Sequence, residues 1–104
     1  MTTRPLHRAE LKFLRSLAHA LKPVVRLGQN GLTDAVTREL DGALERHELV
    51  KVKLAGDSRE ARDAQLDALA SSAGALVVQR IGHTATLYRE NAERPRIDLA
   101  AARG

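Results

Sequence analysis

A short stretch between positions 22 and 33 constrains the fold of this chain more than any other part of its sequence. Pro23 disfavours helical angles at the residue before it, so a preceding helix must end there. The β-branched residues that follow predict a short strand over Val24–Leu27. A Gly-x-x-Gly turn occupies Gly28–Gly31, and Thr33 is a typical N-cap for a second helix. The sequence therefore predicts helix, strand, tight turn and helix in immediate succession.

This predicted turn has a chemical consequence. Its glycines leave main-chain N–H groups uncovered by side chains, beside the positive end of the second helix. Such an arrangement favours anions, above all phosphate. Gln29 and Asn30 at the tip can donate side-chain hydrogen bonds without adding bulk. The alternative is a tight connection that simply needs two glycines, because the pattern alone is weakly specific.

Three helices are predicted from apolar spacing and from signals at their ends. The first helix is expected to start at Thr3 and Pro5 and to end before Pro23. The second is expected to run from Thr33 to His47, and the third from Asp57 to Gly74. Asp57 and Glu60 have the spacing of a capping box, and Gly74 is a natural left-handed stop. The residues expected to face the core are Leu6, Leu14, Leu17, Ala18 and Leu21 in the first helix, Val36, Leu40, Ala43 and Leu44 in the second, and Leu66, Leu69, Ala70 and Ala73 in the third.

Three further strands complete the predicted fold. Residues 48–54 alternate between apolar and charged positions, which indicates a half-exposed strand with Lys51 and Lys53 on one face. Residues 75–81 and 85–89 are expected to form a hairpin. The order α-β-α-β-α-β-β predicts one α/β domain over residues 1–90, with a four-stranded mixed sheet packed with helices. The polar C-terminal tail, residues 91–104, is expected to be loose or a frayed helix.

Positive charge is concentrated at one end of the chain. The 104 residues carry a net charge of +4, and residues 1–30 hold six Lys and Arg against Glu10 alone, a net charge of +5. Concentrated charge of this kind is typical of polyanion partners. The alternative is a helix face that is only solvated. Lys51 and Lys53 leave a similar choice, since Lys contacts phosphate but also protects edge strands from aggregation.

Other kinds of chemistry find little support. There is no Cys, no apolar run of membrane-spanning length and no secretory leader, so we expect a cytoplasmic protein. The turn lacks the Lys of a phosphate-binding P-loop and the third glycine of a dinucleotide fingerprint. No histidine pair has metal-ligand spacing, and no serine has a recognisable catalytic partner. With one Phe, one Tyr and no Trp, Tyr88 is the only candidate for base stacking, because Phe13 is expected to be buried.

Four blocks of the sequence resemble the CRM domain, the chloroplast RNA splicing and ribosome maturation module, in its stand-alone bacterial YhbY-like form. The blocks are Leu14–Val25, Leu27–Thr33, His47–Lys53 and Ile81–Arg89, in order and with fitting gaps. The resemblance covers most of the chain. It implies a fold similar to the C-terminal domain of translation initiation factor three, with an extra N-terminal helix.

The same resemblance implies an RNA-binding module with neither catalysis nor a cofactor. Stand-alone bacterial members are associated with precursors of the large ribosomal subunit. The family's Gly-x-x-Gly loop, its expected RNA contact, corresponds to Gly28–Gly31. Family members often have Lys where this chain has Gln29, a difference that removes one charged phosphate contact but keeps the main-chain donors.

Together these observations predict an RNA-binding protein that acts in large-subunit assembly. The expected partner is ribosomal RNA or a pre-large-subunit particle; no membrane, metal or catalytic residue is expected, and a monomer is favoured. The residues expected to bind RNA are Lys22, Arg26, Gly28, Gln29, Asn30, Gly31, Thr33, Lys51 and Lys53. Two alternatives stay open: a protein-interaction module of the translation machinery, and a binder of phosphate metabolites that uses the same turn.

Overall fold

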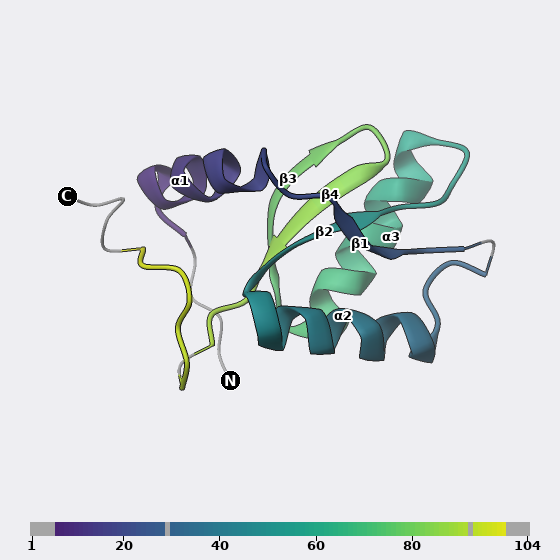
Figure 1. Ribbon diagram of the computed structural model, residues 1–104. Coiled ribbons are helices and arrows are strands. Elements are labelled where there is room, and N and C mark those ends of the chain that lie inside the picture. Colours follow the sequence, from purple (N-terminus) through teal and green to yellow (C-terminus); the bar gives the residue numbers. More distant parts are fainter. Residues whose placement is uncertain (1–5, 29, 92, 100–104) are drawn as a thin grey trace.

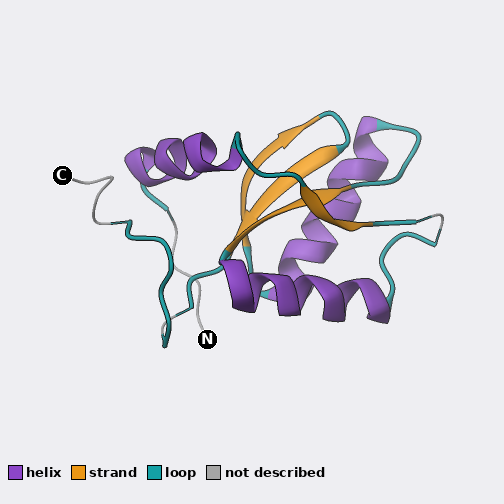
Figure 2. Ribbon diagram, viewed as in Figure 1, coloured by secondary structure: helices purple, strands orange, loops and turns teal. Residues whose placement is uncertain are grey.

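The computed structural model describes residues 6–28, 30–91 and 93–99, and these form three helices and four strands. The elements are α1 (Arg8–Ala18), β1 (Pro23–Arg26), α2 (Asp34–His47), β2 (Leu49–Lys53), α3 (Arg59–Ala73), β3 (Leu76–Ile81) and β4 (Thr84–Tyr88). The predicted α/β order is confirmed. Figures 1 and 2 show α2 and α3 on one face of the sheet, while α1 lies toward the other face near one end.

The four strands form one mixed sheet in the order β1-β2-β4-β3. β1 and β2 are parallel, as expected for two strands joined through a helix, here α2. β4 pairs antiparallel with both β2 and β3. The β3–β4 hairpin turns at Gly82, whose φ of 59° is a left-handed angle that glycine adopts without strain. The mixed sheet predicted from the sequence is therefore confirmed, and β2 lies inside it.

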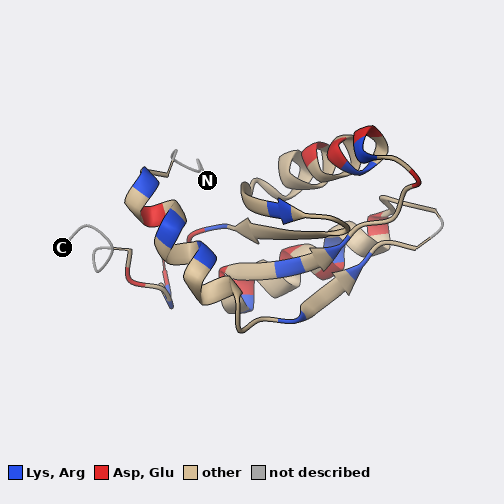
Figure 3. Ribbon diagram, turned by 90° about the horizontal axis from the view of Figure 1, so that it is seen from above, with Lys and Arg blue, Asp and Glu red and all other residues tan. Residues whose placement is uncertain are grey.

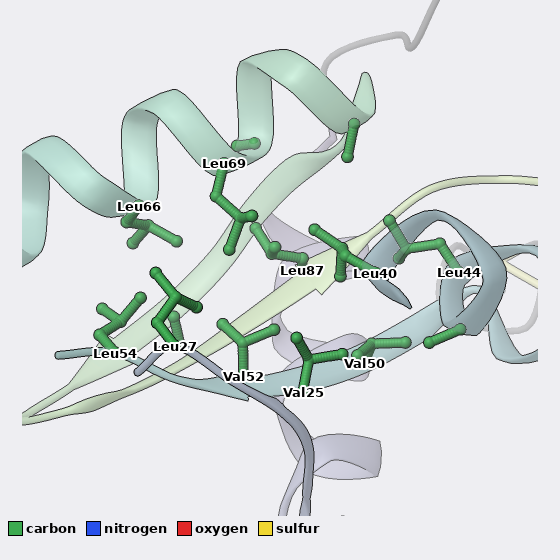
Figure 4. Packing of buried hydrophobic residues seen from close by; sticks show 14 residues of the cluster. Val25, Leu27, Leu40, Leu44, Val50, Val52, Leu54, Leu66, Leu69 and Leu87 are labelled. Carbon is green, nitrogen blue, oxygen red and sulfur yellow. The ribbon is translucent and has the colours of Figure 1, made fainter. Parts of the chain in front are cut away.

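The main core lies between the sheet and the helix pair α2 and α3. Leu40 and Leu44 of α2 and Leu66 and Leu69 of α3 belong to one cluster above the inward side chains of the strands, and Leu87 of β4 lies between Leu69 and Leu40, as Figure 4 shows. All of the residues predicted to face inward from these two helices lie in this core or pack against it. Each fully buried leucine contributes about 1.5–3 kcal/mol relative to an exposed one, so this layer, the larger of the two cores, is a major source of hydrophobic stabilisation.

A smaller core lies on the opposite face of the sheet, where α1 packs. Leu14 and Ala18 of α1 contact Leu49, Val78 and Tyr88 of the strands. Leu49 thus turns away from the main core while Val50 and Val52 face it, as strand alternation requires. The α1 helix is short, so the end of this sheet face beyond it is left open (Figure 1).

The predicted first helix was too long. His7 is the N-cap of α1, its N–H donates to the Glu10 carboxylate at 2.9 Å, and the helix ends at Ala18. The expected start at Thr3 and Pro5 lies outside the described residues. The prediction that Leu17 and Leu21 face the core was wrong, because their exposed fractions are 38% and 36%. Leu17 lies in the last turn of α1 and Leu21 lies beyond its end, and both side chains are on the surface instead.

The ends of the other two helices match the predictions except at one cap. The Thr33 hydroxyl accepts a hydrogen bond from the Val36 N–H at 3.2 Å, and Gly74 ends α3 with a left-handed φ of 62°. The predicted cap at Asp57 was wrong by one residue, since the Ser58 hydroxyl accepts from the Ala61 N–H at 3.1 Å. No helix in the described part of the chain is long and apolar enough to cross a membrane.

The segment after β4 packs against the domain, contrary to the expectation of a loose tail. Glu48, fully buried and with a φ of 62°, accepts hydrogen bonds from the N–H groups of Asn91 at 2.6 Å and Ile97 at 2.8 Å, and also from that of Arg96. Leu99 is buried in the smaller core, with Ile97 packed beside it. Residues 93–99 are therefore held by a carboxylate about half the chain away, which no local sequence pattern could indicate.

Candidate nucleic-acid interface

The Gly28–Gly31 turn is closed by its own main chain. The N–H of Gly31 donates to the carbonyl of Gly28 at 2.9 Å, and Gly31 has a φ of 66°. The preceding Leu27 N–H donates to the Lys53 carbonyl at 2.9 Å, which fixes the turn to the end of the sheet. The N–H of Gly31 is therefore used within the turn and is not available to an anion. Gln29 lies outside the described residues.

A residue that the sequence did not indicate supports this turn from α3. The Gln65 side-chain oxygen accepts a hydrogen bond from the Ala55 N–H at 3.1 Å, which directs its amide nitrogen the other way. That nitrogen lies 3.3 Å from the position a Cβ would take on Gly31. Gln65 therefore places a side-chain donor beside the turn. No short motif links positions 31 and 65, so only the folded chain reveals this pair.

The N-terminus of α2 follows directly after the turn. Thr33 caps it as predicted, and the Thr37 N–H closes the first helical turn on the Thr33 carbonyl at 3.0 Å. The first N–H groups of a helix have no partners within that helix and carry partial positive charge. Asp34, exposed in the first turn, complements the same charge. The turn and this helix end together form a place where an anion can accept main-chain hydrogen bonds.

Three predicted cations lie together on the open face of the sheet. Arg26 of β1 is the direct register partner of Lys53 of β2, and both side chains are exposed. Lys51 lies two residues earlier and so projects from the same face. We call these three residues the basic sheet face. Lys22, also exposed, precedes Pro23, which is the register partner of Lys51.

The place of β2 in the sheet decides between the two interpretations of its lysines. β2 lies between β1 and β4, so it has no free edge. The alternative that Lys51 and Lys53 protect an edge strand is therefore wrong. A Lys pair on an inner strand exposes charge on a face, where it can meet a ligand.

Acidic residues are kept away from the basic sheet face. None of the four described strands contains Asp or Glu. Arg80, the remaining cation of the strands, is instead paired with Asp63 of α3 at 2.6 Å. Among the described residues, none of the ion pairs involves Arg26, Lys51 or Lys53. Figure 3 shows blue segments along β1, β2 and α1 on the side seen from above, with red concentrated on the helices.

Helix α1 extends the positive surface. Arg8, Lys12 and Arg15 are exposed, whereas Glu10, the single acidic residue of this helix, is fully buried. The Arg15 side chain also donates to the Val78 carbonyl of β3 at 3.3 Å. The charge excess of the N-terminal part of the sequence therefore lies beside the open sheet face (Figure 3).

Base stacking on tyrosine finds no support in the structure. Tyr88 is only 2% exposed, so the prediction that it offers a stacking platform was wrong. Its side chain belongs to the smaller core, and Phe13 packs against the same cluster. Any contact of this face with a base must use other side chains.

Taken together, the fold and the site define a small α/β domain with a glycine turn at the end of a basic, carboxylate-free sheet face. The chain belongs to the CRS1 / YhbY (CRM) domain family, which matches residues 6–89. The family resemblance inferred from the four sequence blocks is confirmed.

Two relatives and one solved structure illustrate the family. A Haemophilus influenzae protein named as an RNA-binding protein is 47% identical over 93 residues, which cover 89% of this chain and 92% of the relative. A Pseudomonas aeruginosa protein that carries the name probable RNA-binding protein is 45% identical and covers 83% of each chain. The solution structure of SAV1595 from Staphylococcus aureus has a TM-score of 0.78 at 29% identity, and covers 90% of this chain and 98% of its own.

Proposed function

We propose that this protein binds RNA through the basic sheet face and the adjoining Gly28–Gly31 turn. The observation that carries the proposal is the row of cations formed by exposed Arg26 and Lys53 and half-buried Lys51, which have no ion-pair partner among the described residues and stand on strands without a carboxylate. The names of the Haemophilus and Pseudomonas relatives support the same partner. A polyanion would gain favourable charge along the whole face without meeting a repulsive side chain.

The proposed contacts divide into two kinds. At the turn, one phosphate accepts hydrogen bonds from main-chain N–H groups near Asn30 and at the start of α2. The Gln65 amide and the Thr33 hydroxyl lie nearby as additional side-chain donors. Along the sheet, Lys22 and the basic sheet face contact further phosphates as point charges. Contacts of this kind position RNA without reading its sequence, so specificity must come from RNA shape or from other contacts.

The target that the family resemblance favours is ribosomal RNA in precursors of the large subunit, in the cytoplasm. A module of this size, with few exposed aromatics, suits a role in which it holds a folded RNA surface during assembly. No step of this role requires a catalytic group or a cofactor, and a monomer is the favoured state.

Direct binding to large-subunit ribosomal RNA tests the proposal. Filter binding over a range of salt concentrations should give a straight log–log plot whose slope is about −0.7 to −0.9 per phosphate contacted. Absence of binding at low salt, or affinity that does not change with salt, would contradict the proposed electrostatic contacts.

Gradient fractionation of cell extract separates RNA binding from a protein-interaction role. We expect the protein to sediment with pre-large-subunit particles and to leave those fractions after complete nuclease digestion. If it stays bound to ribosomal proteins once the RNA has been digested, a protein-interaction module is the better description.

A further inference from the structure

An apolar groove adjoins the basic sheet face at the start of β1. It lies between the C-terminal end of α1 and strands β1 and β2, and its volume is about 440 Å³. Leu17, Leu21, Val24 and Leu49 line it, while Lys22 and Lys51 bring positive charge to the same lining. None of its described lining residues is acidic. The groove is therefore an aliphatic surface bordered by cations.

The apolar side chains of this groove are unusually open to water. Leu17 and Leu21 have exposed fractions of 38% and 36%, and Val24 reaches 54%. Isolated exposed leucines are common, but adjoining ones that line a hollow mark a surface that another molecule covers. Leu17 and Leu21 are also the residues whose spacing predicted a buried helix face.

The groove is continuous with the proposed RNA path. Lys51 belongs both to the basic sheet face and to the groove lining, and its register partner Pro23 follows Lys22. From Val24 the chain runs along β1 to Gly28, a distance of about 13 Å at the usual rise of an extended strand. One strand of RNA lying along β1 can therefore reach the turn and the groove together.

We propose that this groove holds an unpaired nucleobase of the bound RNA, with the neighbouring phosphates on Lys22 and Lys51. The inference rests on the proposed function. The flat face of a base would cover Leu21 and Val24 and remove them from water, and the polar base edge would stay at the open side. Aliphatic side chains take the place of the aromatic platforms that other single-strand binders use, since Tyr88 is buried here.

The charges around the groove favour RNA over a protein segment as its occupant. A helix of a partner protein would bury its apolar side chains in the groove. It would gain little from the two lysines of the lining, which stand beside a sheet that is already basic. A nucleotide uses both features at once, because its base is largely apolar in area and its phosphate is an anion. The groove also opens onto the surface that the phosphates are proposed to follow.

Two fluorescein-labelled probes test the inference: a mixed-sequence single-stranded RNA, and the same ribose-phosphate backbone with abasic residues. Leu21→Ser and Val24→Ser should each weaken binding of the base-containing strand about five- to tenfold, the lower part of the range measured for one base contact. Both variants should leave affinity for the abasic strand and the salt slope unchanged. Val24 is more than half exposed, so its variant keeps the test valid if Leu21→Ser fails to fold.

Val77→Ser is the matched control, because Val77 is an aliphatic strand residue with an exposed fraction of 39% that lines neither the groove nor the hollow beside Lys51. It should bind both strands as the unchanged protein does. If Leu21→Ser and Val24→Ser bind the base-containing strand normally, or if Val77→Ser weakens it equally, the base site is overturned and phosphate binding stands. If the unchanged protein binds neither strand but binds large-subunit ribosomal RNA, the base site is overturned; if it binds none of the three, the proposed function itself fails. A groove variant that alters only self-association or binding of a protein partner would also overturn the base site.

Discussion

Gly31 is held in place by its backbone angle and by its neighbour. Its φ of 66° belongs to the left-handed region, where a side chain is strained, and the Gln65 amide leaves little space for a Cβ. The sequence predicted a turn here because Gly-x-x-Gly before a capping Thr33 is a local signal. It could not predict Gln65, because that contact forms only when α3 packs against the end of the sheet.

Gly31→Ala should lower the free energy of unfolding by about 1–2 kcal/mol, since the new methyl group forces a left-handed alanine. Affinity for RNA should fall in parallel as the turn changes shape. Urea unfolding and fluorescence anisotropy measure the two effects. Gly28→Ala is the matched control, because nothing lies within 4 Å of its Cβ position and its φ is not in the left-handed region. Equal destabilisation by both substitutions would show that the angle at Gly31 is not decisive.

Glu48 holds the C-terminal segment that follows β4 in place. It is fully buried, and its carboxylate accepts three main-chain N–H groups from residues 91–97. Glu48→Gln should lower the free energy of unfolding by about 1–3 kcal/mol, because one amide oxygen replaces two charged acceptors and a buried N–H loses its partner.

Hydrogen exchange reports the local effect of Glu48→Gln, and residues 91–99 should exchange faster than in the unchanged protein. Glu39→Gln is the control, since Glu39 is exposed on α2 and, among the described residues, no hydrogen bond joins its side chain to the segment after β4. Exchange that stays equally slow in Glu48→Gln would mean that Ile97 and Leu99 hold the segment by packing alone.

At the scale of the elements, local patterns predicted the helices and strands, but not which strands lie side by side in the sheet. Alternation placed Val50 and Val52 in the core and Lys51 outside it, as the structure confirms. The sequence could not show that β4 inserts between β2 and β3, because strand order depends on long-range pairing. The exposure of Leu21, beyond the end of α1, was missed for a related reason: apolar spacing does not show whether a face is buried in the core or exposed on the surface.

The cap of α3 gives a sharp test at this scale. Ser58→Ala removes the hydroxyl that accepts from the Ala61 N–H, so the free energy of unfolding should fall by about 1 kcal/mol. Asp57→Ala, one residue earlier, should have a much smaller effect. Thermal unfolding followed by circular dichroism compares the two variants. A larger loss for Asp57→Ala would restore the capping box that the sequence predicted.

For the whole molecule, the decisive property is the separation of charge across the sheet. Acidic side chains concentrate on α2 and α3, whereas the open face presents Arg26, Lys51 and Lys53 beside the cations of α1 (Figure 3). The sequence predicted these three residues as part of the RNA-binding surface, and it also predicted the family to which the chain belongs. It did not predict that they would share one carboxylate-free face, which follows from the sheet register and from the side of the sheet that α1 leaves open.

The salt dependence of RNA binding in charge variants tests this claim most directly. The double variant Arg26→Gln with Lys53→Gln should reduce the steepness of the log–log salt slope by about 0.7–0.9 for each cation removed. The double variant Arg38→Gln with Arg59→Gln is the matched control, because it removes two exposed cations from α2 and α3. We predict that only the first pair changes the slope. An unchanged slope in the first pair, or an equal change in both, would contradict RNA binding at the basic sheet face.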